Sequence, residues 1–104
     1  MKTKSAKPLI NYVIFRRGAW SSAQELELAA SRSTRAGQEM ADRVRWIRSY
    51  VIQEPDGRLG SVCIYQATDP ETAREHARCS AMPADEVLPY VKTVVINDDP
   101  EVAA

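Results

Sequence analysis

A Pro-Asp-Gly turn in the middle of the chain constrains the fold more than any other feature. Residues 44–53 before it and residues 59–67 after it are rich in β-branched and aromatic side chains, which favour strands. Proline presets the backbone angle that opens a turn, and Gly57 accepts the positive angle that often closes one. The pattern therefore predicts a β-hairpin, around which the other elements can be placed.

One strand and one helix are predicted on each side of this hairpin. Residues 9–16 are β-rich, and residues 23–40 consist of good helix formers. They follow two capping candidates, Ser21 and Ser22, and Glu25 has the offset of a capping box with Ser22. Residues 70–80 follow a Thr-Asp-Pro helix start, and the β-branched run at residues 90–96 predicts the last strand. The order β-α-β-β-α-β predicts a ferredoxin-like α+β fold, with a four-stranded antiparallel sheet and two helices on one face.

The length of the chain allows one domain. With 104 residues, 44% of them hydrophobic and 27% charged, it has the composition of a single globular unit. We expect the domain to span residues 9–97, with a disordered tail at residues 1–8 and a mobile tail at residues 98–104. Residues 84–88, between the second helix and the last strand, are expected to form only a short turn.

Side-chain alternation divides the hairpin into two faces. It places Trp46, Arg48 and Tyr50 together on one face of the first strand, and it separates Gln66 from Tyr65 in the second strand. Both strands carry apolar residues on both faces, so neither face is polar enough to meet water. We therefore expect the face that the helices leave open to be buried in a symmetric homodimer.

Charge and hydropathy exclude several kinds of partner. The 14 Lys and Arg residues balance the 14 Asp and Glu residues, so no basic excess is present to bind a nucleic acid. No apolar run approaches the roughly 20 residues of a membrane span, and none follows the basic start as it does in a signal peptide. We expect a cytoplasmic protein with no nucleic-acid or membrane partner.

Arg48 and its neighbours form the first candidate site. A guanidinium beside the aromatic rings of Trp46 and Tyr50 suits a carboxylate or an electron-rich ring. The alternative is that both rings pack in the core or at a dimer interface, and that Arg48 pairs with an acid such as Glu54. Gln66 lies among apolar neighbours and needs hydrogen-bond partners, which a ligand or the backbone could supply.

His76 and Cys79 form a second candidate, because residues three apart on a helix lie on the same side. Together with Cys63 they have the donor chemistry of a site for a soft metal. A spacing of three residues on a helix does not by itself indicate a metal site. The alternative is therefore a partly buried histidine and two ordinary thiols. No serine has the sequence context of an activated nucleophile, and no glycine-rich phosphate loop is present.

Four short motifs follow one another along most of the chain. They are Trp46-x-x-Ser49-Tyr50-Val51, Cys63-x-Tyr65-x-Ala67, Arg74-Glu75-His76-Ala77-Arg78 and Pro83-Ala84-Asp85. Together they resemble a family of small bacterial ferredoxin-like proteins, long described as a domain of unknown function and typified by a nickel-binding homodimer. The resemblance spans roughly residues 11–100 and implies the same fold, a homodimer and binding of, or a response to, nickel.

The chain departs from this family at three positions where the resemblance implies metal donors. Where family members often carry glutamate, histidine and an acidic residue, this chain carries Phe15, Arg48 and Gln66. Arginine does not give up its proton to act as a ligand, and its charge would repel a metal ion. We therefore expect no metal cofactor and a pocket for an organic molecule instead.

These residues suggest a metal-independent enzyme that performs a condensation, cyclisation or isomerisation. Its small substrate would carry a carboxylate or phosphate and bind in a pocket of each subunit. The expected catalytic residues are Arg48, His76 and Tyr50, and the expected substrate-binding residues are Phe15, Trp46, Gln66 and Tyr65. One alternative is a nickel-binding or metal-responsive protein with His76, Cys79 and Cys63 as donors. Another is a non-catalytic dimeric module that binds a ligand or another protein.

Overall fold

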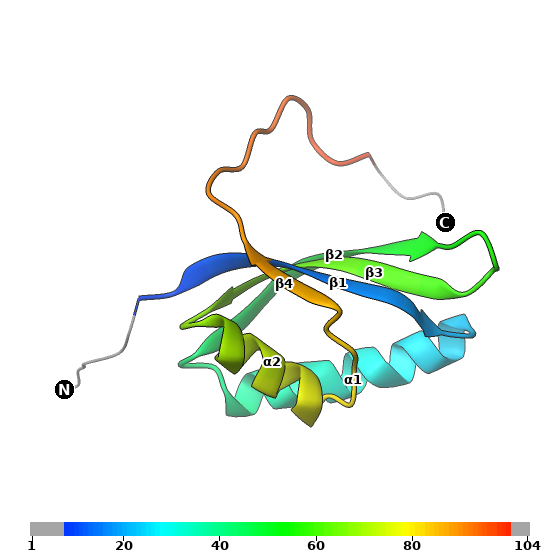
Figure 1. Cartoon of the computed structure of the whole chain (residues 1–104), viewed down its shortest axis with the longest axis horizontal. Coiled ribbons are helices and arrows are strands. Elements are labelled where there is room, and N and C mark those ends of the chain that lie inside the picture. Colours follow the sequence, from blue (N-terminus) through cyan, green and yellow to red (C-terminus); the bar gives the residue numbers. More distant parts are fainter. Residues whose placement is uncertain (1–7, 101–104) are drawn as a thin grey trace.

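The computed structural model describes residues 8–100 and confirms the ferredoxin-like fold. Both helices lie on one face of the sheet, below it in Figure 1. The elements are β1 (Ile10–Trp20), α1 (Ala23–Glu39), β2 (Val44–Gln53), β3 (Leu59–Ala67), α2 (Pro70–Cys79) and β4 (Glu86–Pro89). The strands lie in the order β2-β3-β1-β4, and all neighbours are antiparallel. The predicted tails fall largely on residues 1–7 and 101–104, which lie outside the described residues.

Local capping determines where α1 begins. The Ser22 side chain accepts a hydrogen bond from the Glu25 backbone N–H, at 3.2 Å, as predicted for an N-cap. The Glu25 carboxylate accepts in turn from the backbone N–H of Ser21, at 2.8 Å, so the reciprocal bond falls one residue earlier than in a capping box.

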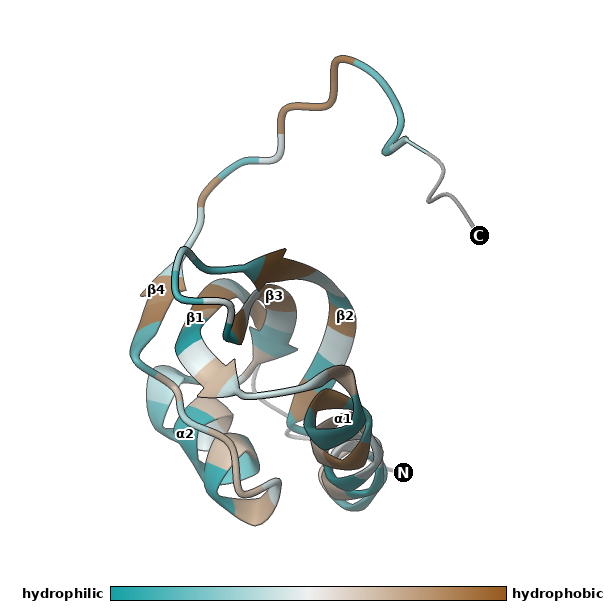
Figure 2. Cartoon of the chain, turned by 90° about the vertical axis from the view of Figure 1, so that its right-hand side faces the viewer, coloured by the Kyte–Doolittle hydropathy of each residue, from teal (hydrophilic) through white to brown (hydrophobic). Residues whose placement is uncertain are grey.

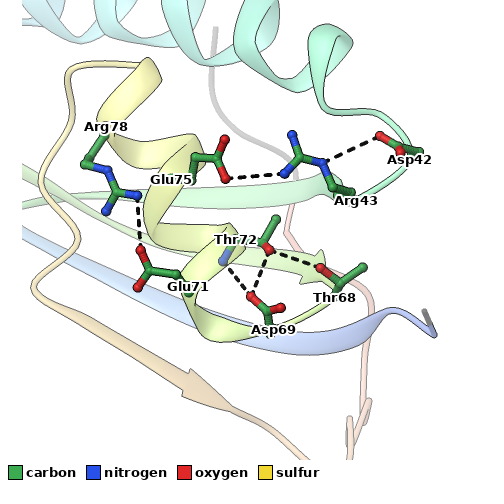
Figure 3. Close-up of polar contacts among 8 residues, drawn as sticks. All are labelled: Asp42, Arg43, Thr68, Asp69, Glu71, Thr72, Glu75 and Arg78. Atoms are coloured by element: carbon green, nitrogen blue, oxygen red, sulfur yellow. Dashed lines mark hydrogen bonds and ion pairs between the residues drawn. The ribbon is translucent and has the colours of Figure 1, made fainter. Parts of the chain in front are cut away.

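Asp69 begins α2 in the same way and helps to set the direction of that helix. Its carboxylate accepts from the backbone N–H of Thr72 at 2.7 Å and from the Thr72 hydroxyl at 2.8 Å (Figure 3). Glu75 pairs with Arg43, in the connection between α1 and β2, over 3.3 Å. The next residue, His76, is thereby carried into the space between the helices and the sheet, where it is fully buried.

The position of the last strand corrects the prediction from sequence. The strand is Glu86–Pro89, where only a short turn was expected, and residues 90–96 form no strand. The run at 86–89 pairs with β1 and buries Val87 opposite Ile14. The β-branched run that follows has no pairing strand within residues 8–100, so strand propensity alone was misleading there. Residues 90–100 instead leave the sheet on the side away from the helices (Figures 1 and 2).

A β-bulge in β2 overturns the predicted grouping of Trp46, Arg48 and Tyr50. Trp46 lies opposite Tyr65 in β3, but Arg48 lies opposite the next residue, Ile64. Ile47 is therefore an extra residue of β2 with no partner in β3. Beyond the bulge, each side chain of β2 points to the face opposite the one that simple alternation predicts. Trp46 therefore faces the helices, whereas Arg48 and Tyr50 face the open side of the sheet.

Candidate ligand site

Arg16 is the most unusual side chain inside the fold. It alternates with the buried Tyr12 and Ile14 along β1, so it faces the helices, and its exposed fraction is 0%. None of its three guanidinium nitrogens has a hydrogen-bond partner among residues 8–100. Burying one such charge costs several kcal/mol. Its Cζ lies 5.6 Å from the centre of the Tyr65 ring, and such a cation–π contact between desolvated groups contributes about 2 kcal/mol or more, which offsets only part of this cost.

The polar groups near Arg16 that the structure describes are Tyr65 and His76, and neither supplies a negative charge. The Tyr65 hydroxyl lies 3.2 Å from the Ser33 hydroxyl, and His76 Nε2 donates to the Ser33 carbonyl at 3.0 Å. Burial raises the pKa of Tyr65, although the charge of Arg16 lowers it in part, so the phenol stays neutral. Burial and, to a lesser degree, the nearby Arg16 lower the pKa of His76, so its ring is neutral as well. Within residues 8–100, Arg16 therefore has no buried counter-charge.

A cavity of about 240 Å³ lies between the sheet and α1. It is slightly smaller than the roughly 300–1,000 Å³ pockets that hold drug-sized ligands, so it suits a smaller molecule. Both tryptophans of the chain border it. Its lining residues are Trp20, Leu26, Glu27, Ala30, Trp46, Ser49, Val51, Ser61, Cys63 and Met82. Two other hollows are larger, about 410 and 490 Å³, but they are shallower and more open to solvent.

The wall between this cavity and Tyr65 is held by a short chain of hydrogen bonds. The Trp46 indole N–H donates to the Ser49 hydroxyl at 2.7 Å, and that hydroxyl donates to the Cys63 sulfur at 2.9 Å. The Ser61 hydroxyl lies 3.2 Å from the same sulfur. The rings of Trp46 and Tyr65 are nearly parallel, with centroids 6.1 Å apart. The bulge in β2 makes this wall possible, because it turns Ser49 toward the helices.

The structure divides the predicted site residues between the two sides of the sheet. Trp46, Tyr65, His76 and Cys63 lie on the side of the helices, and Phe15, Arg48, Tyr50 and Gln66 lie on the open side. The expected catalytic residues Arg48 and Tyr50 are therefore not brought together with His76. Cys79 is exposed on α2.

On the open face, Arg48 and Tyr50 both bind a carboxylate of the chain itself, that of Asp99. The Arg48 guanidinium pairs with Asp99 over 3.2 Å, and the Tyr50 hydroxyl donates to the same carboxylate at 2.9 and 3.1 Å. This hydrogen bond raises the pKa of Tyr50. The alternative in which Arg48 pairs with an acid is confirmed, but the acid is Asp99 and not Glu54, which accepts from Arg17 at 2.6 Å.

Gln66 finds its partners in neighbouring side chains rather than in the backbone. Its carbonyl accepts from Arg45 at 3.1 Å, and its amide group donates to Asn11 at 3.0 Å. Both partners lie on adjacent strands of the same open face.

The residues considered as nickel donors do not form a metal site. His76 and Cys63 are buried, whereas Cys79 is exposed on the surface of α2. Within residues 8–100, no group of three or more His, Cys, Asp or Glu side chains could hold a metal ion. The buried charge of Arg16, which lowers the pKa of His76, would repel a cation from that histidine.

Residues 12–89 match the model of a family described as "Nickel responsive protein SCO4226-like". The chain belongs to this family. The SCO4226-like match covers α1, α2, β2, β3 and β4 and most of β1, and it ends where β4 ends. No curated protein and no solved structure matches the chain. Within residues 8–100, no helix is both long and apolar enough to cross a membrane.

Reasoning from the sequence of this SCO4226-like protein missed Arg16. Alternation along the first strand contains the signal, because Tyr12, Ile14 and Arg16 occupy every second position. A cation in phase with two large apolar residues predicts a buried charge, which needs either a partner or a function.

Proposed function

We propose that this SCO4226-like protein is a non-catalytic dimeric module that binds a small molecule between the sheet and the helices of each subunit. The observation that carries this proposal is the apolar cavity bordered by Trp20 and Trp46. A partly enclosed apolar pocket of about 240 Å³, with two indole rings at its border, has the character of a site for a small molecule.

The separation of the acid–base groups argues against the enzyme that the sequence suggested. Condensation, cyclisation and isomerisation need a proton donor or acceptor within hydrogen-bond reach of the substrate. The sheet lies between His76 and the pair formed by Arg48 and Tyr50, and His76 Nε2 already donates to Ser33. Of the cavity-lining side chains, Glu27 is the carboxylate, and it lies exposed on α1.

The open face of the sheet supports self-association. Ile47, Tyr50 and Leu88 are between 40% and 47% exposed on this side of the sheet or at its edges. The segment that follows β4 adds more exposed apolar side chains, which are Val91, Val94, Val95 and Ile96. Single subunits rarely leave so much apolar surface in water, and a second copy would cover it in a two-fold dimer.

Tryptophan fluorescence tests the ligand site, because both tryptophans border the cavity. We expect a small aromatic probe such as 3-phenylpropionate to change the emission of the protein in a saturable way. Ala30→Leu would fill the cavity and abolish the change, whereas Ala23→Leu, on an exposed part of α1, would leave it intact. No saturable change, or the same change in Ala30→Leu, would contradict the proposed function.

The family match favours nickel binding as a second candidate. Titration calorimetry with nickel chloride at neutral pH would decide between the two. We expect no heat of specific binding, because the described residues supply no cluster of donors. Stoichiometric micromolar binding that persists in Cys79→Ser would favour the metal-binding function.

A further inference from the structure

The position of Arg16 relates it to the cavity. Its Cα pairs with that of Ser61 across the β1–β3 ladder, and its guanidinium reaches the ring of Tyr65, four residues farther along β3. The side chain therefore runs along the inner face of the sheet past Cys63, which lies between those two positions. Ser61 and Cys63 also line the cavity, whereas Arg16 does not, so the cavity and the Arg16 side chain have these two residues as common neighbours.

The acidic side chains of the neighbourhood have other partners. Glu54 accepts from Arg17 and from the backbone of Gly18, and the Asp85 carboxylate accepts from the backbone N–H of Arg17 at 2.6 Å. Glu27 borders the cavity from α1 and is exposed to solvent. No buried carboxylate is present within residues 8–100, since the buried charged or polar residues are Arg16, Ser33, Ser61, Thr72, His76 and Ser80.

An isolated buried cation is costly, and replacing it by an apolar residue of similar size often stabilises a protein. A binding role explains why a cation stands here. When an anion enters, the two charges meet in a medium of low dielectric constant, where their attraction is much stronger than in water. The desolvation of Arg16 has then already occurred in the free protein.

Resting on the proposed function, we infer that the ligand is a small organic monoanion, with an apolar body in the cavity and a carboxylate on the Arg16 guanidinium. The cavity surface that the body would touch is apolar and includes two indole rings, which suits an aromatic or branched aliphatic group. A planar guanidinium binds a carboxylate through two parallel hydrogen bonds. Because Arg16 does not itself line the cavity, its long side chain would turn toward Ser61 and Cys63 to meet the carboxylate.

A pair of probes that differ only in charge tests this inference. In fluorescence titrations at neutral pH, 3-phenylpropionate should bind the wild-type protein roughly tenfold or more tightly than its neutral amide, 3-phenylpropanamide, as expected for hydrogen bonds to a charged group. Arg16→Met should lose this preference and bind both probes equally. Arg17→Met, which changes the exposed neighbouring arginine, should keep it.

The outcomes separate the inference from the proposed function. If the amide binds the wild-type protein as tightly as the acid, the inference is wrong while the cavity remains a ligand site. If neither probe binds, both the inference and the proposed function fail. If Arg16→Met does not fold, Arg16→Gln gives the same comparison, and an unchanged preference for the acid in that variant would overturn the role of Arg16.

Discussion

Arg16 lies over the ring of Tyr65, with 5.6 Å between Cζ and the ring centre, and neither side chain is exposed to solvent. The phenol is a weak partner for the guanidinium, because burial keeps it protonated. This pairing leaves all three guanidinium nitrogens without a hydrogen bond inside residues 8–100. Among the residues that the structure describes, the interior therefore holds a charge that no buried side chain neutralises.

Arg16→Met should increase the free energy of unfolding of the ligand-free protein by about 1–4 kcal/mol, because it removes a buried unpaired charge and keeps the volume. Urea denaturation followed by circular dichroism measures this change. As a matched control, Arg17→Met should lower the stability by less than about 1 kcal/mol, since Arg17 is an exposed member of an ion pair. A large loss of stability in Arg16→Met would show that Arg16 is a structural residue.

As the pH decreases below 6.5, the free energy of unfolding should decrease because of His76, the only histidine of the chain. Burial lowers its pKa in the folded state, so below pH 6.5 the unfolded chain binds a proton that the folded chain does not. This contribution to stability is complete above pH 6.5. It is lost as the pH falls toward the folded pKa, with a slope of at most about 1.4 kcal/mol per pH unit.

Urea unfolding between pH 5 and 8 measures this slope, and His76→Gln should remove most of it while it keeps a donor for the Ser33 carbonyl. Glu25 and Glu54, whose pKa values are lowered from 4.5, contribute at lower pH and do not obscure it. A slope that is the same in His76→Gln would mean that His76 is not buried as a neutral ring.

The open face should hold two copies together. Ile64→Lys places a charge near the centre of that face, where Ile64 is half-buried, and should convert a dimer to a monomer in size-exclusion chromatography with light scattering. Leu28→Lys, on the outer side of α1 where Leu28 is 58% exposed, should leave the dimer intact. A wild-type protein that is monomeric at high concentration would contradict the dimer.

Two glycines should respond in opposite ways to replacement by alanine. A Cβ at Gly60 would lie 2.5 Å from the carbonyl oxygen of Arg16, so Gly60→Ala should cost about 1–3 kcal/mol and disturb the strand that carries Arg16. A Cβ at Gly37 would meet only His76 Nε2, at an ordinary 3.6 Å. Gly37→Ala should therefore stabilise α1, by about 0.5–1 kcal/mol. Thermal melts of the two variants would test both expectations, and equal effects would contradict them.

Local signals explain why the fold could be predicted from the sequence. The turn at Pro55–Gly57 and the caps at Ser22 and Asp69 act through neighbouring residues, so the sequence contains them in full. The position of β4 depends instead on pairing with distant β1, which buries Val87, and strand propensity pointed to the β-branched residues that follow it.

The candidate site could be predicted only in part, because one extra residue in β2 changes which side chains share a face of the sheet. Ile47 has no local feature that marks it as the extra residue of a bulge, yet it decides that Arg48 faces away from Trp46. Arg16, in contrast, could have been found from simple alternation.

The most direct test is to locate the bound probe by nuclear Overhauser effects between 3-phenylpropionate and isotope-labelled protein. We predict contacts from the ring protons of the probe to the Met82 methyl group and to the indole protons of Trp20 and Trp46, which border the cavity. Contacts to the methyl groups of Val13 and Ile64, on the open face of the sheet, would place the ligand on the wrong side and contradict the account.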